Sequence, residues 1–495
     1  MLVPALSSRN DERALPHPFV MRSPDRDNHP PEMFPQTKPL RKVRAAQVFR
    51  VTPHDVERRY RSGIGTARQR TRNVRGFTMS VTRTTSAKGW AVCLVAIFGG
   101  ISLALVQNKV SPIITVLMDV FGISMGTAGL LSTIFTFVGI IMALPAAMII
   151  KRFGPKKAGV AALAFAIVGS LIGLATDNVG VLIVSRVVEG TGIGIIAVLA
   201  PTLISMWFPP EKRGLPMGLW GSWMMVSQTI LFFCAAPLSG AFGWQGMWML
   251  GLVACVLTAV LFLVFVESPA PGESFADVES SEVSIREGLK SRASFTLAIA
   301  AACFTFCSFT FVSWVSAYWG VATSWSLEEI GRWVAILYLV EMVYAWIIGG
   351  ILNRVKNRKR LGVVSFFAYG LIGLAAFLIT GEPLVVAFVF VFPIFDALIP
   401  CICWTIGPET ASKPMYAGIA LGVLNIGLNT GTLLSAPVSG ALVESFGWVA
   451  AGACFLIAAL VGAAAMAATK LSSAAPSSET PDDAPACAAG AANPS

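Results

Sequence analysis

The chain contains nearly the same segment twice, 200 residues apart: "APLSGAFGW" at residues 236–244 and "APVSGALVESFGW" at residues 436–448. In both copies an Ala-Pro step, a Ser-Gly-Ala step and a Phe-Gly-Trp ending close an apolar run. Such a recurrence indicates a duplicated half, and an internal repeat bears on the whole fold. The alternative is a chance pairing in a glycine-rich chain.

The composition indicates a membrane protein. Hydrophobic residues make up 55% of the chain and charged residues 13%, with a mean hydropathy of +0.70, whereas soluble domains carry about 25% charged residues. A helix needs about 20 apolar residues to cross a bilayer, and no alternating ten-residue pattern of a barrel is present. We therefore predict an all-α polytopic membrane protein with twelve spans, near residues 90–117, 124–149, 158–176, 179–206, 215–237, 246–265, 294–318, 330–351, 361–380, 384–406, 415–437 and 448–469.

Two further pairs of sequence features recur at close to the spacing of the repeat. The basic turns "KRFGPKK" (151–157) and "NRVKNRKR" (353–360) follow the second and eighth spans, and Gly-xxx-Gly pairs open the fifth and eleventh at 214–218 and 418–422. Spans six apart therefore correspond, which predicts two parallel six-helix bundles. The expected organisation is a basic tail (1–88), an N-terminal bundle (89–266), a cytoplasmic linker (267–293), a C-terminal bundle (294–470) and a C-terminal tail (471–495).

The loops and tails predict the orientation. Lys and Arg gather in alternate loops, and cytoplasmic loops retain positive charge, so we expect both termini inside a plasma (inner) membrane. Residues 1–88 hold 18 Lys or Arg against 7 Asp or Glu. This apolar-poor segment is expected to be disordered, and the start-like Met79 suggests that residues 1–78 are absent from the natural product or dispensable. Contact of this tail with nucleic acid or anionic lipid is the less favoured alternative.

The chain resembles the major facilitator superfamily over residues 89–470. The fourth-span pattern R-x-x-x-G-x-G is intact at Arg186, Gly190 and Gly192. The family's loop G-x-x-x-D-R-x-G-R-K after the second span is matched in its basic residues and glycine, but Lys151 and, in the second copy, Asn353 replace the acid. The resemblance implies twelve helices, alternating access and a gating loop at Lys151, Arg152, Gly154, Asn353 and Arg354. A weaker resemblance, in "NKVSPIITVLMDVFGIS" and "RGLPMGLWGSW", is to cyanate- and nitrate-type and organic-anion carriers.

Five ionisable side chains fall within the spans: Lys109, Arg186, Glu189, Glu341 and Asp396. A charge at the bilayer centre costs roughly 2.5 to 3.5 kcal/mol unless it is paired or hydrated, so these groups should face the protein interior. Arg186 and Glu189, at i and i+3, can pair, and that pair is alternatively a purely structural salt bridge. Lys109 could instead reach the interface. Among uncharged groups, Gln228, Asn425 and Asn429 could add hydrogen bonds or serve only in packing.

The residue inventory excludes several functions. All three histidines lie in the N-terminal tail, and no phosphate-binding loop G-x-x-x-x-G-K-[ST] is present, which argues against an enzyme or an ATP-driven pump. We expect no metal and no cofactor. The predicted function is a monomeric secondary transporter of a small anionic solute, with Lys109 and Arg186 attracting the anion and Glu341 or Asp396 carrying a coupling proton. The alternatives are efflux of amphipathic compounds and a non-transporting membrane sensor.

Overall fold

The computed structural model describes residues 87–142, 145–268, 274, 285–352 and 354–471. Within these ranges every regular element is a helix, and twelve helical segments are long and apolar enough to cross a membrane. The predicted fold class is therefore confirmed. Most of the two tails and much of the predicted linker lie outside the described ranges, and so does Asn353.

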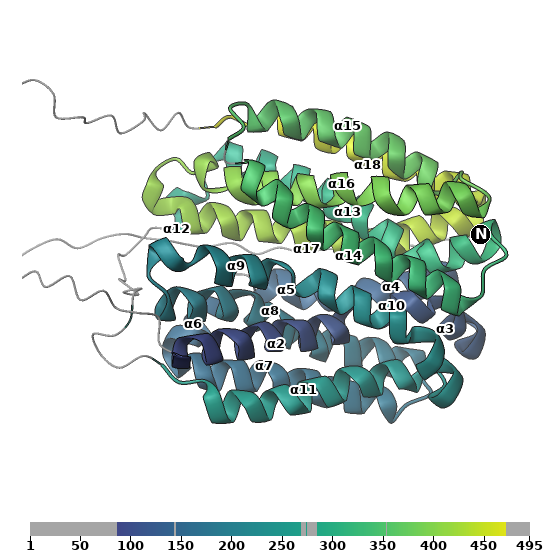
Figure 1. Cartoon of the computed structure of the whole chain (residues 1–495), viewed down its shortest axis with the longest axis horizontal. Helices are drawn as coiled ribbons and strands as arrows, with labels where there is room; N and C mark the ends of the chain where they lie inside the picture. Colours follow the sequence, from purple (N-terminus) through teal and green to yellow (C-terminus); the bar gives the residue numbers. More distant parts are fainter. Residues whose placement is uncertain (1–86, 143–144, 269–273, 275–284, 353, 472–495) are drawn as a thin grey trace, which may run out of the picture. The chain divides into compact units, whose positions relative to one another are not determined.

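The first six spans appear in purple to teal in Figure 1 and the second six in green to yellow. The first half consists of α2 (Ala87–Asn108) with η1 (Ser111–Ile113) and α3 (Ile114–Phe121), α4 (Met125–Thr133) with α5 (Phe135–Met142) and α6 (Pro145–Phe153), α7 (Pro155–Leu174), α8 (Val179–Trp207), η2 (Pro210–Lys212), α9 (Gly214–Gly221) with α10 (Trp223–Phe242), and α11 (Gln245–Phe265). The second half consists of α12 (Ile285–Gly288), α13 (Arg292–Ala322), α14 (Leu327–Leu352), α15 (Arg358–Ala376), α16 (Glu382–Ile406), η3 (Pro408–Thr410), η4 (Pro414–Tyr416), α17 (Ala417–Phe446) and α18 (Trp448–Ala468).

The repeated phrase is a helix end followed by a tight turn into the next span. Gly243 ends α10 with φ 63° and Gly447 ends α17 with φ 77°. Positive φ is accessible to glycine without a Cβ clash, and it stops a helix. The next spans, α11 and α18, start within two residues of these glycines. The two copies therefore perform the same structural task at equivalent places in the two halves.

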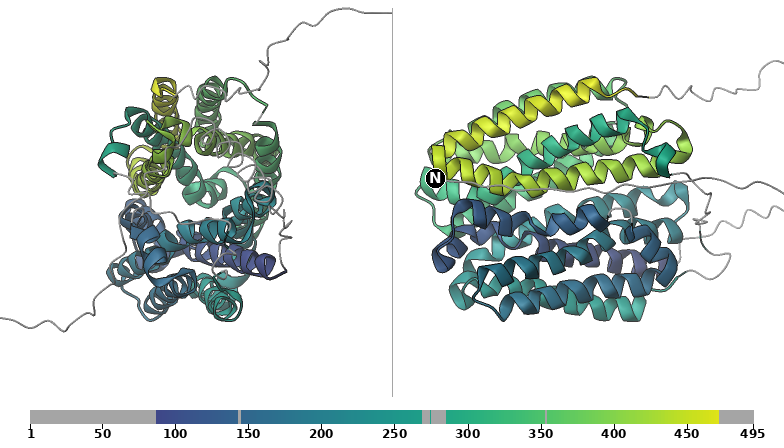
Figure 2. Two further views of the ribbon diagram at one scale, coloured as in Figure 1. Left: turned by 90° about the vertical axis from the view of Figure 1, so that its left-hand side faces the viewer. Right: turned by 180° about the vertical axis from the view of Figure 1, so that it is seen from behind.

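Each half packs mainly on itself. In the first half α8 packs against α7 and α2, and α11 packs against α7 and α2; in the second, α13 packs against α17 and α18, and α15 against α18. Figure 2 shows the two groups of helices end-on and from behind. The halves meet mainly where α10 packs against α14 and where α4 and α5 pack against α17, with smaller contacts of α13 with η1 and α3.

The closest backbone contacts between the halves lie at one end of the spans. We call the end that bears the loops 151–157 and 354–360 the basic end, and the other the opposite end. Near the opposite end, a Cβ on Gly129 would lie 2.4 Å from the carbonyl of Ala436, and one on Gly331 would lie 2.4 Å from the carbonyl oxygen of Phe232. Only glycine permits this approach.

Hydrogen bonds reinforce the same region. The hydroxyls of Ser132 and Ser313 lie 3.3 Å apart, and Thr133 donates to the carbonyl oxygen of Leu433 at 3.0 Å. Nearer the basic end the halves still touch, because Trp346 Nε1 of α14 donates to Ser222 Oγ at 2.8 Å, although a Cβ on Gly349, Gly350 or Gly418 would meet no atom within 4 Å. The structure is therefore closed between the bundles at the opposite end.

Candidate functional site

Three charged side chains of the N-terminal bundle form one buried cluster. Lys109 Nζ lies 2.6 Å from Glu189 Oε1, and Arg186 Nη1 lies 2.5 Å from Glu189 Oε2. All three side chains are completely buried. The expected i, i+3 pairing of Arg186 with Glu189 is present, and Lys109, for which reaching the interface was the alternative, is buried and shares the same carboxylate. Glu189 therefore pairs with two cations, and the cluster has a net charge of +1.

Arg186 also holds the backbone where the first span is interrupted. Helix α2 ends at Asn108, and the chain resumes as a 3-10 turn only at Ser111. The last carbonyls of a helix have no partner within it. Arg186 Nη1 donates to the carbonyl oxygen of Val106 at 2.6 Å, and Nη2 donates to that of Gln107. The guanidinium thus provides hydrogen-bond donors for two of the last carbonyl groups of α2.

Lys109, which lies in the interruption between α2 and η1, has fewer hydrogen-bond partners than Arg186. Besides Glu189, its ammonium lies 3.4 Å from Ser170 Oγ and 4.3 Å from the centre of the Trp248 ring. A cation over an indole face is stabilised by the ring quadrupole. The serine also donates to Glu189 Oε1 at 2.8 Å. The cluster is therefore drawn from the first, third, fourth and sixth spans.

The C-terminal bundle holds two buried acids and a different arrangement. Asp396 on α16 accepts hydrogen bonds from the Tyr369 hydroxyl and from Ser308 Oγ, the latter at 3.2 Å. Glu341 on α14 is 5% exposed, makes no hydrogen bond within the described part of the chain, and has an Oε2 atom with no partner. No Lys or Arg pairs with either acid among the described residues. The two bundles thus bury charges of opposite sign.

Of the predicted amide residues, Asn429 lies at the boundary between the bundles. Asn429 Nδ2 donates to the carbonyl and side-chain oxygens of Asn425, each at 2.9 Å. Asn429 also packs against α5, where a Cβ on Gly139 would lie 2.5 Å from Asn429 Oδ1. Both asparagines are partly exposed. Gln228 on α10 is buried, and its Oε1 has no partner.

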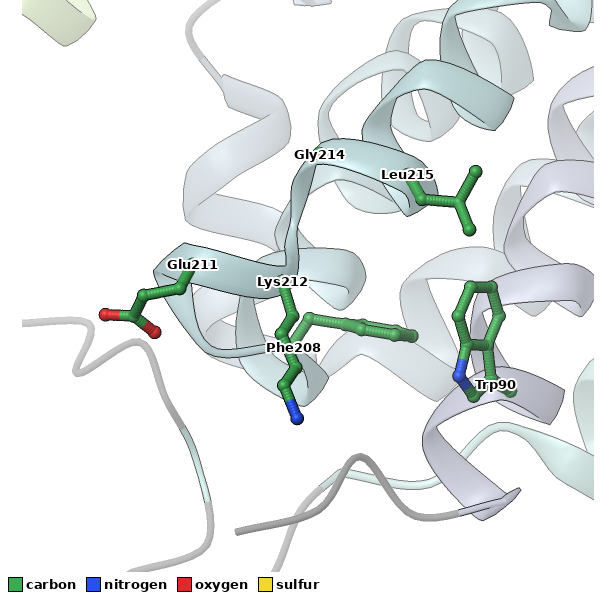
Figure 3. Close-up of a pocket in the computed structure, with 6 residues that line it drawn as sticks. All are labelled: Trp90, Phe208, Glu211, Lys212, Gly214 and Leu215. Carbon is green, nitrogen blue, oxygen red and sulfur yellow. The ribbon is translucent and has the colours of Figure 1, made fainter. Parts of the chain in front are cut away.

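A separate pocket of about 340 Å³ lies at the basic end of the N-terminal bundle (Figure 3). Trp90 and Phe208 meet edge to face in it, with ring centres 5.0 Å apart, beside the side chain of Lys212. None of the five buried ionisable residues lines this pocket. We therefore place the candidate site at the buried charges and the bundle boundary, not here.

The Major Facilitator Superfamily model matches residues 92–417. The chain is a member of the Major Facilitator Superfamily. Proteins of this family that it resembles are transporters, so the chain is a transporter and not an enzyme. This result confirms the family resemblance inferred from Arg186, Gly190, Gly192 and the basic loops.

Three relatives within the Major Facilitator Superfamily show the range of similarity. The chain is 24% identical to the probable sulfoacetate transporter SauU of Cupriavidus necator, over 66% of this chain and 80% of that protein. It is 22% identical to probable anion transporter 7 of Oryza sativa subsp. japonica, over 67% of this chain and 82% of that protein. Its 27% identity to the uncharacterized transporter YhcA of Bacillus subtilis spans 42% of this chain but only 39% of that protein.

Solved structures share the Major Facilitator Superfamily fold. A bacterial homolog of the human lysosomal transporter Spinster, in an inward-facing and unoccupied conformation, matches with a TM-score of 0.61 and 14% identity, over 78% of this chain and 95% of that one. The D-xylose-proton symporter matches with a TM-score of 0.57 and 18% identity, over 75% and 97%. These similarities support the architecture alone.

The basic residues of the predicted gating loop are exposed in the structure. Lys151 and Arg152 are exposed at the end of α6, and Gly154 starts the next helix with φ 81°. Among the described residues, Lys151, Arg152 and Arg354 form no ion pair. Asn353 lies outside the described residues. The gating role of this loop therefore stays a prediction.

Sequence reasoning did not single out four residues that complete these sites. Ser170 and Trp248 contact Lys109, and Tyr369 and Ser308 contact Asp396. Hydroxyl and indole groups are common in these spans, and nothing in the sequence distinguishes these members. A signal was available for the interruption of the first span, where the polar run 107–109 precedes Pro112, because proline cannot continue the hydrogen bonding of a helix.

Proposed function

We propose that this protein is a proton-coupled transporter of a small anionic solute that works by alternating access of its two bundles. Membership of the Major Facilitator Superfamily supports transport. The names of two relatives that align over about two thirds of the chain, a probable sulfoacetate transporter and a probable anion transporter, support an anionic solute. Coupling to protons is argued from the buried charges.

The proposal rests on the burial of Glu341 without a partner among the described residues. It is buried midway along α14, and it has neither a cation nor a hydrogen-bond donor beside it in the described part of the chain. An uncompensated carboxylate inside a membrane protein is costly. We therefore propose that Glu341 holds a proton in this conformation and exchanges it only when the bundles move and water reaches it.

The sum of the buried charges suggests an order of binding. With Glu341 protonated, the cations Lys109 and Arg186 balance the anions Glu189 and Asp396. Loss of the proton adds one negative charge, which repels an anionic solute in a low-dielectric interior. We therefore propose that the proton binds before the anion and that the two travel together.

The solute itself is proposed to bind at the bundle boundary. Lys109 and Arg186 have no exposed surface in this conformation, so they would attract an anion through the net charge of their cluster. Asn425, Asn429 and Gln228 are the proposed direct contacts, since the two asparagines are partly exposed and Gln228 has a free acceptor. The protein is proposed to act as a monomer.

The membrane and the orientation complete the proposal. The loops at the basic end carry clustered Lys and Arg, as cytoplasmic loops do. We propose that this end faces the cytoplasm and that the protein lies in the plasma (inner) membrane with both termini inside. Under this assignment the structure is closed toward the outside. The predicted domain limits at residues 88, 266, 293 and 470 belong to the same proposal.

The test is uptake into proteoliposomes containing the purified protein. Small sulfonates and carboxylates, neutral sugars and amphipathic cations would each be offered with and without an inward proton gradient. We expect accumulation of an anion only with the gradient. Glu341→Gln should abolish this accumulation but retain solute exchange at equal pH. Glu328→Gln, which changes an exposed acid of the same helix, is the matched control and should behave as the native protein.

Two outcomes would overturn the proposal. Uptake restricted to sugars or amphipathic cations would replace the anionic solute with another class. Gradient-driven accumulation that survives Glu341→Gln would remove this residue as the proton carrier, and a uniporter or an anion exchanger would then be favoured.

A further inference from the structure

The two acids of the C-terminal bundle occupy matching positions on two helices that pack against each other. Helices α14 and α16 both run from the opposite end toward the basic end and pack against each other. Glu341 follows the first residue of α14, Leu327, by 14 positions, and Asp396 follows the first residue of α16, Glu382, by 14 positions. At a rise of 1.5 Å per residue, each Cα atom lies about 21 Å along its helix from the first residue. The carboxyl groups interact electrostatically.

The surroundings of the two acids differ sharply. Asp396 accepts hydrogen bonds from the hydroxyls of Tyr369 and Ser308. Tyr369 is itself fully buried, with its ring 5.4 Å from that of Phe392 and 4.9 Å from that of Phe455. Its hydroxyl is thus held in place by packing. Glu341 has no such donor.

The remaining titratable groups around Glu341 do not supply a positive charge. Those that interact with it, besides Asp396, are Tyr338 on its own helix, Tyr369 on α15 and Cys401 on α16. Helix α10 contains no charged residue, and in α13 the one charged residue is Arg292 at its first position. Within the described residues, Asp396 is therefore the one other charged group that can bear on Glu341.

We infer that Asp396 is a positioning residue, which stays ionised on its two hydroxyl donors and so leaves the transferable proton on Glu341. Two neighbouring buried acids cannot easily both ionise, and they share one proton between them. Hydroxyl donors stabilise the ionised partner, so the proton resides on the acid that lacks them. The inference rests on the proposed proton coupling, and it divides the two tasks between the acids.

The division of tasks predicts opposite effects for two variants on the pH profile of uptake. Asp396→Asn removes the neighbouring negative charge, so Glu341 loses its proton more readily and the alkaline limb of the profile moves to lower pH. Tyr369→Phe removes a donor from Asp396, so the pair holds its proton more strongly and the limb moves to higher pH. The Tyr369→Phe shift should be about one pH unit, the size expected for one hydrogen bond to a charged group, and the loss of the Asp396 charge should shift the limb by about one pH unit or more.

The experiment measures the KM and the maximal rate of gradient-driven uptake at a series of pH values. Tyr318→Phe is the matched control, since its hydroxyl donates instead to the carbonyl oxygen of Ile379 at 2.9 Å, and it should leave the profile in place. Ser308→Ala provides the same test as Tyr369→Phe, with a smaller shift to higher pH, and it applies even if the tyrosine variant does not reach the membrane.

The outcomes separate this inference from the proposed function. If Glu341→Gln abolishes coupling but the Asp396 and donor variants shift the limb in the same direction, or not at all, the positioning role of Asp396 is wrong and the proton carrier stands. If Glu341→Gln leaves coupling intact, the proposed function itself fails. Opposite shifts of the two variants, with Tyr318→Phe unchanged, would support the inference.

Discussion

Lys109 and Glu189 are 80 positions apart in the sequence, yet their side chains meet at 2.6 Å without any exposed surface. The same carboxylate also serves Arg186. Breaking a buried ion pair costs more than the pair contributes, because the remaining charge stays buried without compensation. Glu189 is therefore the residue on which the charge balance of the N-terminal bundle depends.

We first predict that Glu189→Gln destabilises the protein by about 3 to 5 kcal/mol, since it leaves two buried cations without their anion. Lys109→Met should cost less, because the Arg186–Glu189 pair it leaves is neutral. Adding Lys109→Met to Glu189→Gln should recover part of the loss. The measurement is the midpoint of thermal unfolding in detergent. A larger loss for Lys109→Met than for Glu189→Gln would contradict this charge balance.

Arg186→Lys tests the support of the interrupted first span. A lysine has the charge but cannot reach the carbonyls of Val106 and Gln107 together with Glu189, as the planar guanidinium does. Each buried carbonyl left without a donor costs about 1 to 3 kcal/mol. We expect folded protein in the membrane with a lower unfolding midpoint and strongly impaired transport. Arg332→Lys, at an exposed arginine of α14 outside the predicted site, is the control, and normal transport by Arg186→Lys would refute this role.

The glycine contact between α14 and α10 predicts a shift between conformations. Gly331→Val would place a side chain against the carbonyl oxygen of Phe232 and push the bundles apart at the opposite end. Ser313→Cys, in a background without the natural cysteines, is buried there and should react faster with a thiol reagent once Gly331→Val is added. Gly349→Val on the same helix meets no neighbouring atom and should leave the rate unchanged. An equal rate in all three proteins would show that this contact does not hold the bundles closed.

The proposed orientation predicts which loops can be labelled from outside intact cells. A membrane-impermeant maleimide should modify cysteine introduced at Ser324, in the loop at the opposite end, but not at Lys356, at the basic end. Both positions should react once the membrane is permeabilised. Labelling at position 356 in intact cells would reverse the assignment and place the closed end toward the cytoplasm.

The sequence predicts the fold better than it predicts the site. Span length, loop charge and the repeat are local or periodic signals, and together they indicated twelve helices in two halves and their orientation. The pairing of Arg186 with Glu189 was also accessible, because residues three apart share a helix face. The contact of Lys109 with Glu189 was not, since it depends on how α2 packs against α8. The hydroxyl donors to Asp396 were hidden for the same reason.

The cluster of Lys109, Arg186 and Glu189 has a consequence for how the chain is made. All its charged members, and Ser170 with them, precede residue 207, so they are synthesised before the fifth span exists. A nascent chain with four spans in the bilayer already contains every group needed to neutralise Glu189. Asp396 likewise emerges after both of its donors, Ser308 and Tyr369. In both bundles, the partners of a buried acid are therefore synthesised before the acid itself.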